Sequence, residues 1–316
     1  MHLGSVPTDA SGLQAQLLPL LHEVLGAEVE LLGYRIANQH HDYLVLLAQV
    51  RHPSTQVVVK LAGPEASIAC SFERTAALHH LVATRTDIPM PEVLGVDVSY
   101  RAWPWRYLIK RHIPGREWAD VRRKMNAQQL SDAYRQIGEA VAQLHSLRFS
   151  GFGELASDGT VERRDPYITA LGERARRLIK SARLRDLFLS VLHKNAGLFL
   201  DVGEASLCHE DLHGHNILFR HQGGRWRLAT VLDFDKAWAG HHETDLARLD
   251  FWQGMTSREF WSAYEAISPT EPLYRYRRPI YQLLWCLEYA QPTVKHLTDT
   301  QRLCAELGLQ PVEHFG

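Results

Sequence analysis

The sequence predicts an α+β chain in two parts, a small β-rich part over residues 1–115 and a larger, mainly helical part over residues 116–316. Short β-prone runs separated by polar turns fill the first part. Apolar residues at helical spacing dominate the second part. The pattern changes at Pro114-Gly115, a dipeptide typical of a turn. Each part therefore has the size and pattern of a domain of its own.

The first part predicts a helix, a set of strands and a second helix. Apolar residues recur at helical spacing from Leu13 to Leu25. Polar turns separate the β-prone runs that come next, which favours an antiparallel meander; the runs are 28–36, 43–50 and 56–63. A helix is then expected over 66–84 and a further strand over 105–113. Prolines interrupt the stretch 88–98 between them, so no element is predicted there.

The second part predicts helices around one short pair of strands. The stretch 131–147 is amphipathic, with Ser131 as its expected N-cap, and 167–194 is expected to be one continuous helical run. Residues 216–235 predict two strands joined at Gly223-Gly224. Helices are expected from there to the end of the chain.

Composition narrows the class of protein. The chain is 45% hydrophobic and 22% charged with a net charge of −1, which indicates neither disorder nor a general attraction to nucleic acid or membranes. Its four cysteines form no C-x-x-C pair, which suits a reducing cytoplasm. The sequence has no apolar run of the roughly 20 residues that cross a bilayer, and no signal peptide. We expect a cytoplasmic protein; its oligomeric state is left open.

Residues 207–219 carry two overlapping motifs. His209, Glu210 and His213 match a zinc-protease signature, which requires both histidines on one helix with Glu210 as general base. The local sequence disfavours that helix, because Gly214 follows the second histidine directly and a β-prone run comes next. A distant third zinc ligand, such as Glu243, is left open.

The same loop matches part of a kinase catalytic loop, and other parts stand in the order that phosphoryl transfer requires. That reaction depends on positioning, on metal-held phosphates and on a carboxylate beside the attacking hydroxyl. Lys60 ends a β-prone run and Glu73 lies in the following helix. Asp211 is placed to orient the hydroxyl and accept its proton. Asn216 and Asp233 offer oxygen ligands that suit Mg²⁺.

In this arrangement the chain resembles the aminoglycoside phosphotransferase / choline kinase-like family, small-molecule kinases with a protein-kinase-like fold. The family's loop H-G-D-L-H-x-x-N stands here as HEDLHGHN, and its metal motif stands as VLDFD. Its later D-L-A segment stands as TDLARL, and its G-x-x-x-A-x-L-H segment as IGEAVAQLHSL. The resemblance spans roughly residues 30 to 250. It implies a bilobal fold, with a β-rich N-terminal nucleotide-binding lobe and a helical C-terminal lobe for catalysis and substrate binding.

The resemblance also implies roles for residues of the second part. Asp211 is the catalytic base, Asn216 and Asp233 hold Mg²⁺, and His209 braces the loop. Glu210 replaces the family's usual glycine. Two roles are left open for Asp245. It either caps its helix and braces the loop, or it contacts the substrate.

In the first part, the resemblance implies a site for ATP (or GTP). Lys60 binds the phosphates, and Glu73 is its expected partner. Backbone groups from Arg111 to Ile113 are expected to face the adenine.

The sequence leaves the substrate open. We expect a small-molecule kinase acting on a hydroxyl of an antibiotic of aminoglycoside or macrolide type. Residues 201–271 hold twelve acidic and six basic residues, and such an acidic surface would attract a polyamine. Tyr281, Trp285 and Tyr289 share one face of a predicted helix. That aromatic face either packs in the core or forms a wall for a substrate with an apolar body. Alternatives are a metabolic hydroxyl compound (choline, homoserine or amino-sugar type) and a non-catalytic kinase-like module.

Overall fold

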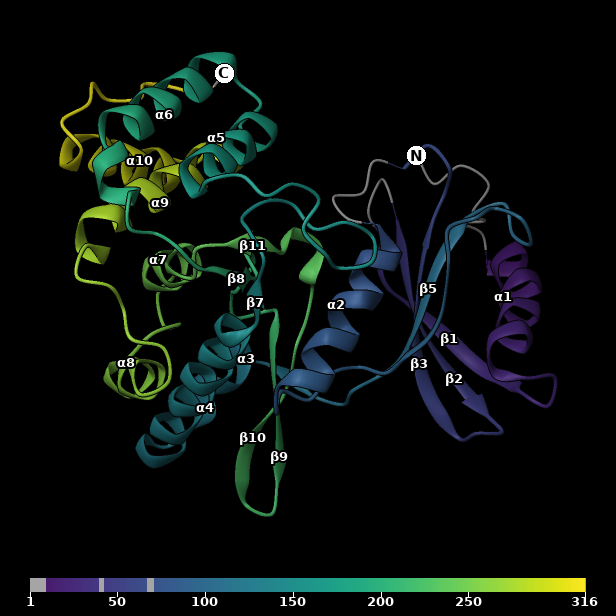
Figure 1. Ribbon diagram of the computed structural model, residues 1–316. Helices are drawn as coiled ribbons and strands as arrows, with labels where there is room; N and C mark the ends of the chain where they lie inside the picture. Colours follow the sequence, from purple (N-terminus) through teal and green to yellow (C-terminus); the bar gives the residue numbers. More distant parts are fainter. Residues whose placement is uncertain (1–9, 40–42, 67–70, 316) are drawn as a thin grey trace. The chain divides into compact units, whose positions relative to one another are not determined.

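The computed structural model describes residues 10–39, 43–66 and 71–315, and the chain divides into two compact units (Figure 1). The first unit comprises the described residues up to Gly115, together with Ser157–Gly159 and Ala229–Val231. All other described residues form the second unit.

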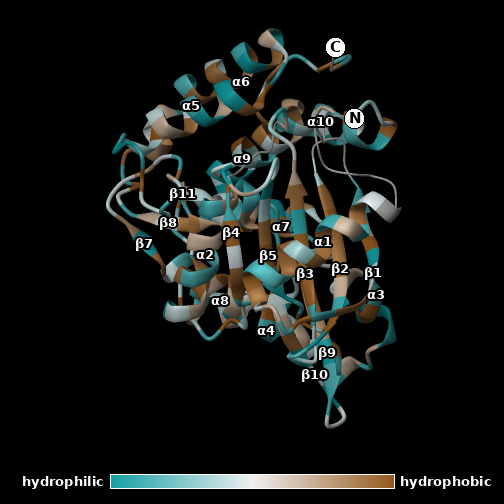
Figure 2. Cartoon of the chain, turned by 90° about the vertical axis from the view of Figure 1, so that its right-hand side faces the viewer, coloured by the Kyte–Doolittle hydropathy of each residue, from teal (hydrophilic) through white to brown (hydrophobic). Residues whose placement is uncertain are grey.

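The first unit is built on a five-stranded antiparallel sheet with strand order β1-β2-β3-β5-β4. The strands are β1 (Glu30–Gln39), β2 (Leu44–Arg51), β3 (Thr55–Ala62), β4 (Val93–Asp97) and β5 (Arg106–Arg111). Buried and more exposed residues alternate along β2, as expected for a strand with one face in the core. Figure 2 shows apolar residues along β2 and β3.

Two helices of the first unit pack against this sheet. Helix α1 (Ala10–Leu25) buries Leu13, Leu17 and Leu20 in the cluster that includes Ile109 of β5. Helix α2 (Phe72–Arg85) buries Phe72 in a cluster with Leu108, the neighbour of Ile109 on the same strand. Because successive side chains of a strand point to opposite faces, the two clusters lie on opposite faces of the sheet.

Two features of the first unit differ from the sequence prediction. Strand β4 lies inside the proline-interrupted stretch 88–98, where no element was predicted; it starts shortly after Pro91 and pairs only with β5, at the edge of the sheet. Helix α2 begins at Phe72, because the Ser71 side chain accepts the Arg74 N–H at 3.1 Å and caps it. The expected start at residue 66 falls before this N-cap, and residues 67–70 lie outside the described ranges.

The second unit is mainly helical. Its helices are α3 (Trp118–Val121), α4 (Ala127–Ser146), α5 (Tyr167–Leu178), α6 (Ala182–Lys194), α7 (Glu243–Phe251), α8 (Arg258–Glu265), α9 (Tyr274–Tyr289) and α10 (Val294–Glu306). A small sheet of order β11-β8-β7 combines Trp238–Gly240, Ala205–Cys208 and Arg148–Phe149. Another has the order β10-β9-β6 and combines Arg225–Val231, whose last three residues belong to the first unit, with Ile217–Gln222 and Arg116–Glu117. Strands β9 and β10 confirm the predicted pair and its turn, where Gly223 and Gly224 both have positive φ.

Two helix boundaries correct the prediction. Helix α4 begins at Ala127, so Ser131 is not its N-cap. Asn126 is, and it forms a capping box in which its side chain accepts the Gln129 N–H while the Gln129 side chain accepts the Asn126 N–H. The run 167–194 is two helices, because Ile179 leaves helical geometry with its side chain buried and α6 starts after Ser181.

The sheet-rich first unit and the helical second unit confirm the predicted α+β class. Among the described residues, no helix combines the length and the apolar character that crossing a membrane requires.

Candidate active site

The catalytic-loop motif lies in an irregular segment between β8 and β9 of the second unit. It contains no helix through His209 and His213, as the sequence predicted. The His209 ring contacts the Leu232 carbonyl, and the Glu210 carboxylate is buried against Trp238. Because these side chains are held by separate partners, the zinc-protease interpretation is wrong.

His209 ties the loop to the segment after β10. Its Nε2 donates to the Leu232 carbonyl oxygen at 2.8 Å, while its Nδ1 accepts the Asp211 N–H at 3.2 Å. This pair of bonds fixes the orientation of the ring. The side chain is fully buried and packs against Phe234, with 4.5 Å between ring centroids. His209 therefore positions the backbone on which Asp211 stands.

Asp245, near the start of α7, holds the same loop from the other side. Its Oδ2 accepts the His209 N–H at 2.6 Å, and its Oδ1 accepts the Glu210 N–H at 2.7 Å. His145 of α4 contacts Oδ2 at 3.1 Å. Burial raises the pKa of the Asp245 carboxyl, but the contacts with His145 and His209 outweigh burial and leave that pKa below its ordinary value. Of the two roles left open for Asp245, the structure shows the brace.

Glu210 occupies a backbone position that favours glycine. Its φ is +64°, in the left-handed region, which explains why a glycine is usual there. The buried carboxylate accepts the Trp238 Nε1–H at 2.9 Å and the Thr244 hydroxyl at 2.6 Å, and it pairs with Arg248 at 3.2 Å. These contacts offset the backbone strain, so Glu210 is a structural part of the loop that the motif comparison missed.

The structure brings Asp211, Asn216 and Asp233 to one place. The Asn216 side-chain NH₂ donates to the Asp211 carbonyl oxygen at 3.0 Å and lies 3.5 Å from its Oδ2. The Leu232 N–H donates to the Asn216 carbonyl at 2.8 Å, which sets the next residue, Asp233, beside them. Asp233 itself has a φ of +65°. The three polar residues predicted from widely spaced motifs thus form one cluster.

Two further residues contact the Asp211 carboxylate. The Lys236 ammonium lies 3.3 Å from Oδ1, and the Tyr289 hydroxyl donates to the same oxygen at 3.3 Å. Lys236 also donates to the Tyr289 hydroxyl at 2.8 Å. Lys236 was not singled out from the sequence, although its position three residues after Asp233 was a usable signal.

These neighbours keep Asp211 ionised. Burial raises the pKa of the Asp211 carboxyl, but Lys236 first and Arg248 next lower it, and the net pKa lies below its ordinary value. The pKa of Lys236 is raised correspondingly, since Asp211 and Glu288 outweigh the effect of burial. Glu288 links the two cations, at 3.8 Å from Lys236 and 3.4 Å from Arg248. At neutral pH the cluster therefore holds a carboxylate able to accept a proton.

The residues predicted to bind nucleotide lie in the first unit. Lys60 stands on β3, and its ammonium lies 4.5 Å from the centroid of the Tyr43 ring and 5.5 Å from that of Phe72. Glu73 lies in the first turn of α2.

Backbone groups at the end of β5 are partly used by the sheet. The Arg111 N–H donates to the Glu92 carbonyl at 2.8 Å, and the Arg111 side chain pairs with the exposed Glu92 carboxylate. The His112 N–H donates to the Gln56 carbonyl at 2.9 Å. Ile113 comes next and lies outside the strand.

Two adjoining cavities open in the second unit next to the Asp211 cluster. The first has a volume of about 390 Å³ and is lined by Trp118, Ala119, Arg122, His213, Gly214, His215, Trp252, Gln253, Met255 and Tyr289. The second, of about 400 Å³, is lined by Phe251, Trp252, Gln253, Trp285, Tyr289, Gln291, Thr293, Lys295, His296 and Asp299. Tyr289 and His213 reach the two oxygens of Asp211, at 3.3 and 3.9 Å.

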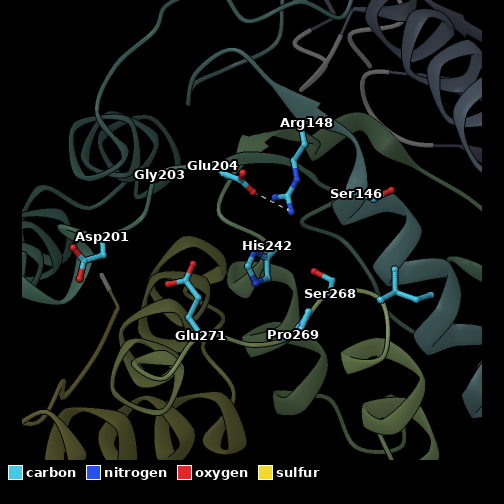
Figure 3. A pocket seen from close by; sticks show the side chains of 10 residues that line it. Ser146, Arg148, Asp201, Gly203, Glu204, His242, Ser268, Pro269 and Glu271 are labelled. Atoms are coloured by element: carbon cyan, nitrogen blue, oxygen red, sulfur yellow. Dashed lines mark ion pairs between the residues drawn. The ribbon is translucent and has the colours of Figure 1, made fainter.

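A separate cavity of about 340 Å³ surrounds His242 (Figure 3). Arg148 and Glu204 form an ion pair at its wall, with 3.3 Å between their charged atoms, and Glu271, which contacts the His241 ring at 3.1 Å, also lines it. Burial lowers the pKa of His242 to about 2, helped by the neighbouring histidines, so its ring is neutral. This cavity shares no lining residue with the two beside Asp211.

Fold and catalytic loop together define a small-molecule kinase of protein-kinase-like architecture. The model of the phosphotransferase enzyme family (APH) matches residues 36–279, and the chain belongs to this family. A search of the curated proteins gives no match.

Solved structures support the same class through their fold. A provisionally assigned fructosamine-3-kinase from Thermobifida fusca is 19% identical with a TM-score of 0.66, over 92% of this chain and 98% of that one. A thermostable mutant of the aminoglycoside phosphotransferase APH(4)-Ia, in ternary complex with AMP-PNP and hygromycin B, is 17% identical with a TM-score of 0.61, over 92% and 96%. The ethanolamine kinase of Plasmodium vivax is 14% identical with a TM-score of 0.62, over 96% and 90%. At these identities the similarity shows the fold and leaves the substrate open.

Proposed function

We propose that this protein transfers the γ-phosphoryl group of ATP to a hydroxyl of a small molecule, with Asp211 as the base. The observation that carries the proposal is the cluster itself. An ionised, largely buried carboxylate lies beside Asn216 and Asp233, and its neighbours His213 and Tyr289 line a cavity large enough for a small molecule. The fold and family support the nucleotide half of the reaction.

In the proposed reaction Asp211 acts late and without prior activation. The acceptor hydroxyl oxygen forms a bond to the γ-phosphorus, the bond from that phosphorus to the β–γ bridging oxygen breaks, and ADP leaves. Asp211 orients the hydroxyl and takes its proton as the phosphoryl group transfers. A low pKa suits this task, because the carboxylate must be ionised at neutral pH and need not be a strong base. Lys236 and Tyr289 fix the carboxylate in place.

Asn216 and Asp233 fit a magnesium ion. The Asn216 amide nitrogen is anchored on the Asp211 carbonyl, which leaves the amide oxygen as the ligand atom. An amide oxygen with a carboxylate is a hard donor set of the kind that Mg²⁺ prefers. When bound, Mg²⁺ would neutralise phosphate charge on the nucleotide.

The nucleotide site is proposed in the first unit. Lys60 would bind the phosphates, with Glu73 as its expected partner, and Ile113 with the carbonyl of Arg111 would face the adenine. The choice between ATP and GTP is part of the test. The alternative, a non-catalytic kinase-like module, would not need the base and both metal ligands to lie together.

The substrate is proposed from the same comparisons and from the cavities. Proteins of similar fold include one that binds hygromycin B and an ethanolamine kinase. Antibiotic and metabolic compounds are therefore both candidate acceptors. Both cavities beside Asp211 are walled by aromatic side chains, which suits an acceptor with a ring or an apolar body.

A labelled-phosphate transfer assay tests this function. Purified protein would be incubated with γ-labelled ATP or GTP and an acceptor panel of kanamycin, erythromycin, choline, homoserine and glucosides, with and without Mg²⁺. We expect transfer to the hydroxyl of at least one acceptor and only with Mg²⁺. Nucleotide binding without any transfer or ATP hydrolysis would identify a non-catalytic module.

A further inference from the structure

The two cavities beside Asp211 form one continuous lining, which we call the acceptor groove. They share Trp252, Gln253 and Tyr289. Because Tyr289 and His213 each contact an oxygen of Asp211, a hydroxyl bound in the groove would lie against the proposed base. The class of acceptor inferred from this groove rests on the proposed function.

The lining of the acceptor groove has almost no negative charge. Among the described residues that line it, the only carboxylate is Asp299, which is paired with Lys295 at 2.7 Å. Arg122 adds a positive charge in the cavity that contains His213. A cationic acceptor would therefore meet a neutral to positive wall.

The acidic residues of 201–271, which favoured a polyamine on sequence grounds, are used elsewhere. Within this fully described stretch, none of the twelve lines the acceptor groove, and Asp211 adjoins it through Tyr289 and His213. Other carboxylates are paired with buried arginines or line the separate cavity of Figure 3; they are Glu210, Glu243, Glu271, Asp201 and Glu204. A count of charges along the chain thus gave the wrong picture of this surface.

Aromatic faces dominate the acceptor groove instead. Trp252 is 37% exposed, which is high for a tryptophan, and it lines both cavities. Trp285 holds it in place through an edge contact, with 5.1 Å between centroids at 71°. Trp285 in turn packs on Tyr289 at 5.2 Å. The result is an exposed indole packed between Trp285 and His213, suited to a flat or ring-shaped apolar surface.

We infer that the acceptor is an uncharged or anionic hydroxyl compound with a ring face, such as a glycoside, and that a polycationic aminoglycoside is not the substrate. The indole of Trp252 supports the ring. Gln253 and Tyr289 offer polar groups for hydroxyls, and Arg122 accommodates a negative substituent.

Binding without nucleotide tests this inference independently of catalysis. Calorimetric titrations would use phenyl β-glucoside (neutral), phenyl β-glucuronide (anionic), the 2-amino analogue of the glucoside (cationic) and kanamycin (polycationic). We expect the neutral and anionic probes to bind at least tenfold more tightly than the two cationic probes. Tighter binding of kanamycin or of the amino analogue, or no binding by any probe, would overturn the inference.

Two variants locate the binding. Trp252→Ala should weaken the neutral probe about tenfold, because it removes the exposed indole face on which the ring would stack. Tyr276→Ala, which removes an aromatic side chain that is 48% exposed and outside the acceptor groove, should leave it unchanged. Equal effects of the two substitutions would refute the role of Trp252.

A charge change tests the electrostatic part. Gln253→Glu should bring the amino analogue closer to the neutral probe in affinity, whereas Glu204→Gln in the Figure 3 cavity should not. If the ratio of the affinities for the neutral probe and the amino analogue is unchanged in Gln253→Glu, the inference is wrong. If the neutral probe binds as expected but is never phosphorylated with Mg²⁺ and ATP, the proposed function fails while the inferred ligand class stands.

Discussion

Replacement of Asp245 by asparagine should release the catalytic loop. The carboxylate is fully buried and accepts two backbone N–H groups, from His209 at 2.6 Å and Glu210 at 2.7 Å. An asparagine keeps one acceptor oxygen and turns its NH₂ toward one of these donors. That N–H is left buried and unpaired, and the other hydrogen bond loses its charge assistance.

The expected cost comes from those two changes. A hydrogen bond to a charged group contributes about 1.5–3 kcal/mol, and a neutral one about 1 kcal/mol. One bond lost and one weakened give a loss of roughly 3 kcal/mol in the free energy of unfolding. That is a large part of the roughly 5–15 kcal/mol typical of a domain. The left-handed backbone of Glu210 should relax as well, which moves the neighbouring Asp211 and lowers kcat.

Urea unfolding followed by circular dichroism at pH 7 would measure the loss, and phosphotransfer would measure kcat. Asp250→Asn is the matched control, because Asp250 lies on the same helix and pairs with Arg278 at a partly exposed site. It should change stability by less than about 1 kcal/mol. An Asp245→Asn protein as stable and as active as the control would refute the bracing role.

Three further substitutions probe other charges. Lys236→Met removes the first cation that lowers the pKa of Asp211, so the acidic limb of the kcat–pH profile should move to higher pH; an unchanged limb would mean that Lys236 does not set this pKa. In the parent protein the folded state lowers the pKa of His242 to about 2, so between pH 7 and pH 5 only the unfolded state gains that proton and the free energy of unfolding falls. His242→Phe removes this proton, so its free energy of unfolding should fall by about 2 kcal/mol less over the same pH range. An equal fall in both proteins would show that His242 is protonated when folded. Arg277→Met strands the buried Glu243 carboxylate, bonded at 2.6 and 2.8 Å, and should cost about 3–5 kcal/mol, part of which Glu243→Gln in the same chain should restore. No recovery in the double variant would argue against this pair as the cause.

Local patterns in the sequence predicted the fold class and the core of the site. Strand and helix periodicity depends on near neighbours, so the β-rich and helical parts could be seen directly. The motif spacing likewise brought Asp211, Asn216 and Asp233 together. Ser131 was predicted as the N-cap of α4, but the capping box of Asn126 and Gln129 starts the helix one turn earlier.

Tertiary contacts were beyond the sequence. Lys236 and Tyr289 meet at Asp211 although 53 residues separate them. Glu210 looked like a neutral replacement of glycine, since nothing local shows that Arg248 lies against it. The sequence also did not show that many acidic residues of 201–271 are buried, and their number alone favoured a polyamine substrate. The break at Ile179 depends on where that side chain finds the core.

The proposed reaction depends most on Asp211 as the base, and the Asp211→Asn variant tests it most directly. With the acceptor that supports transfer in the parent protein, kcat should fall by about 10²–10⁴-fold, the usual contribution of positioned proton transfer. The affinity for Mg²⁺–ATP, measured by calorimetry on the same sample, should be nearly unchanged, because Lys60, Asn216 and Asp233 remain. A variant that folds, binds nucleotide and retains a kcat within a few-fold of the parent value would contradict the assignment of Asp211 as the base.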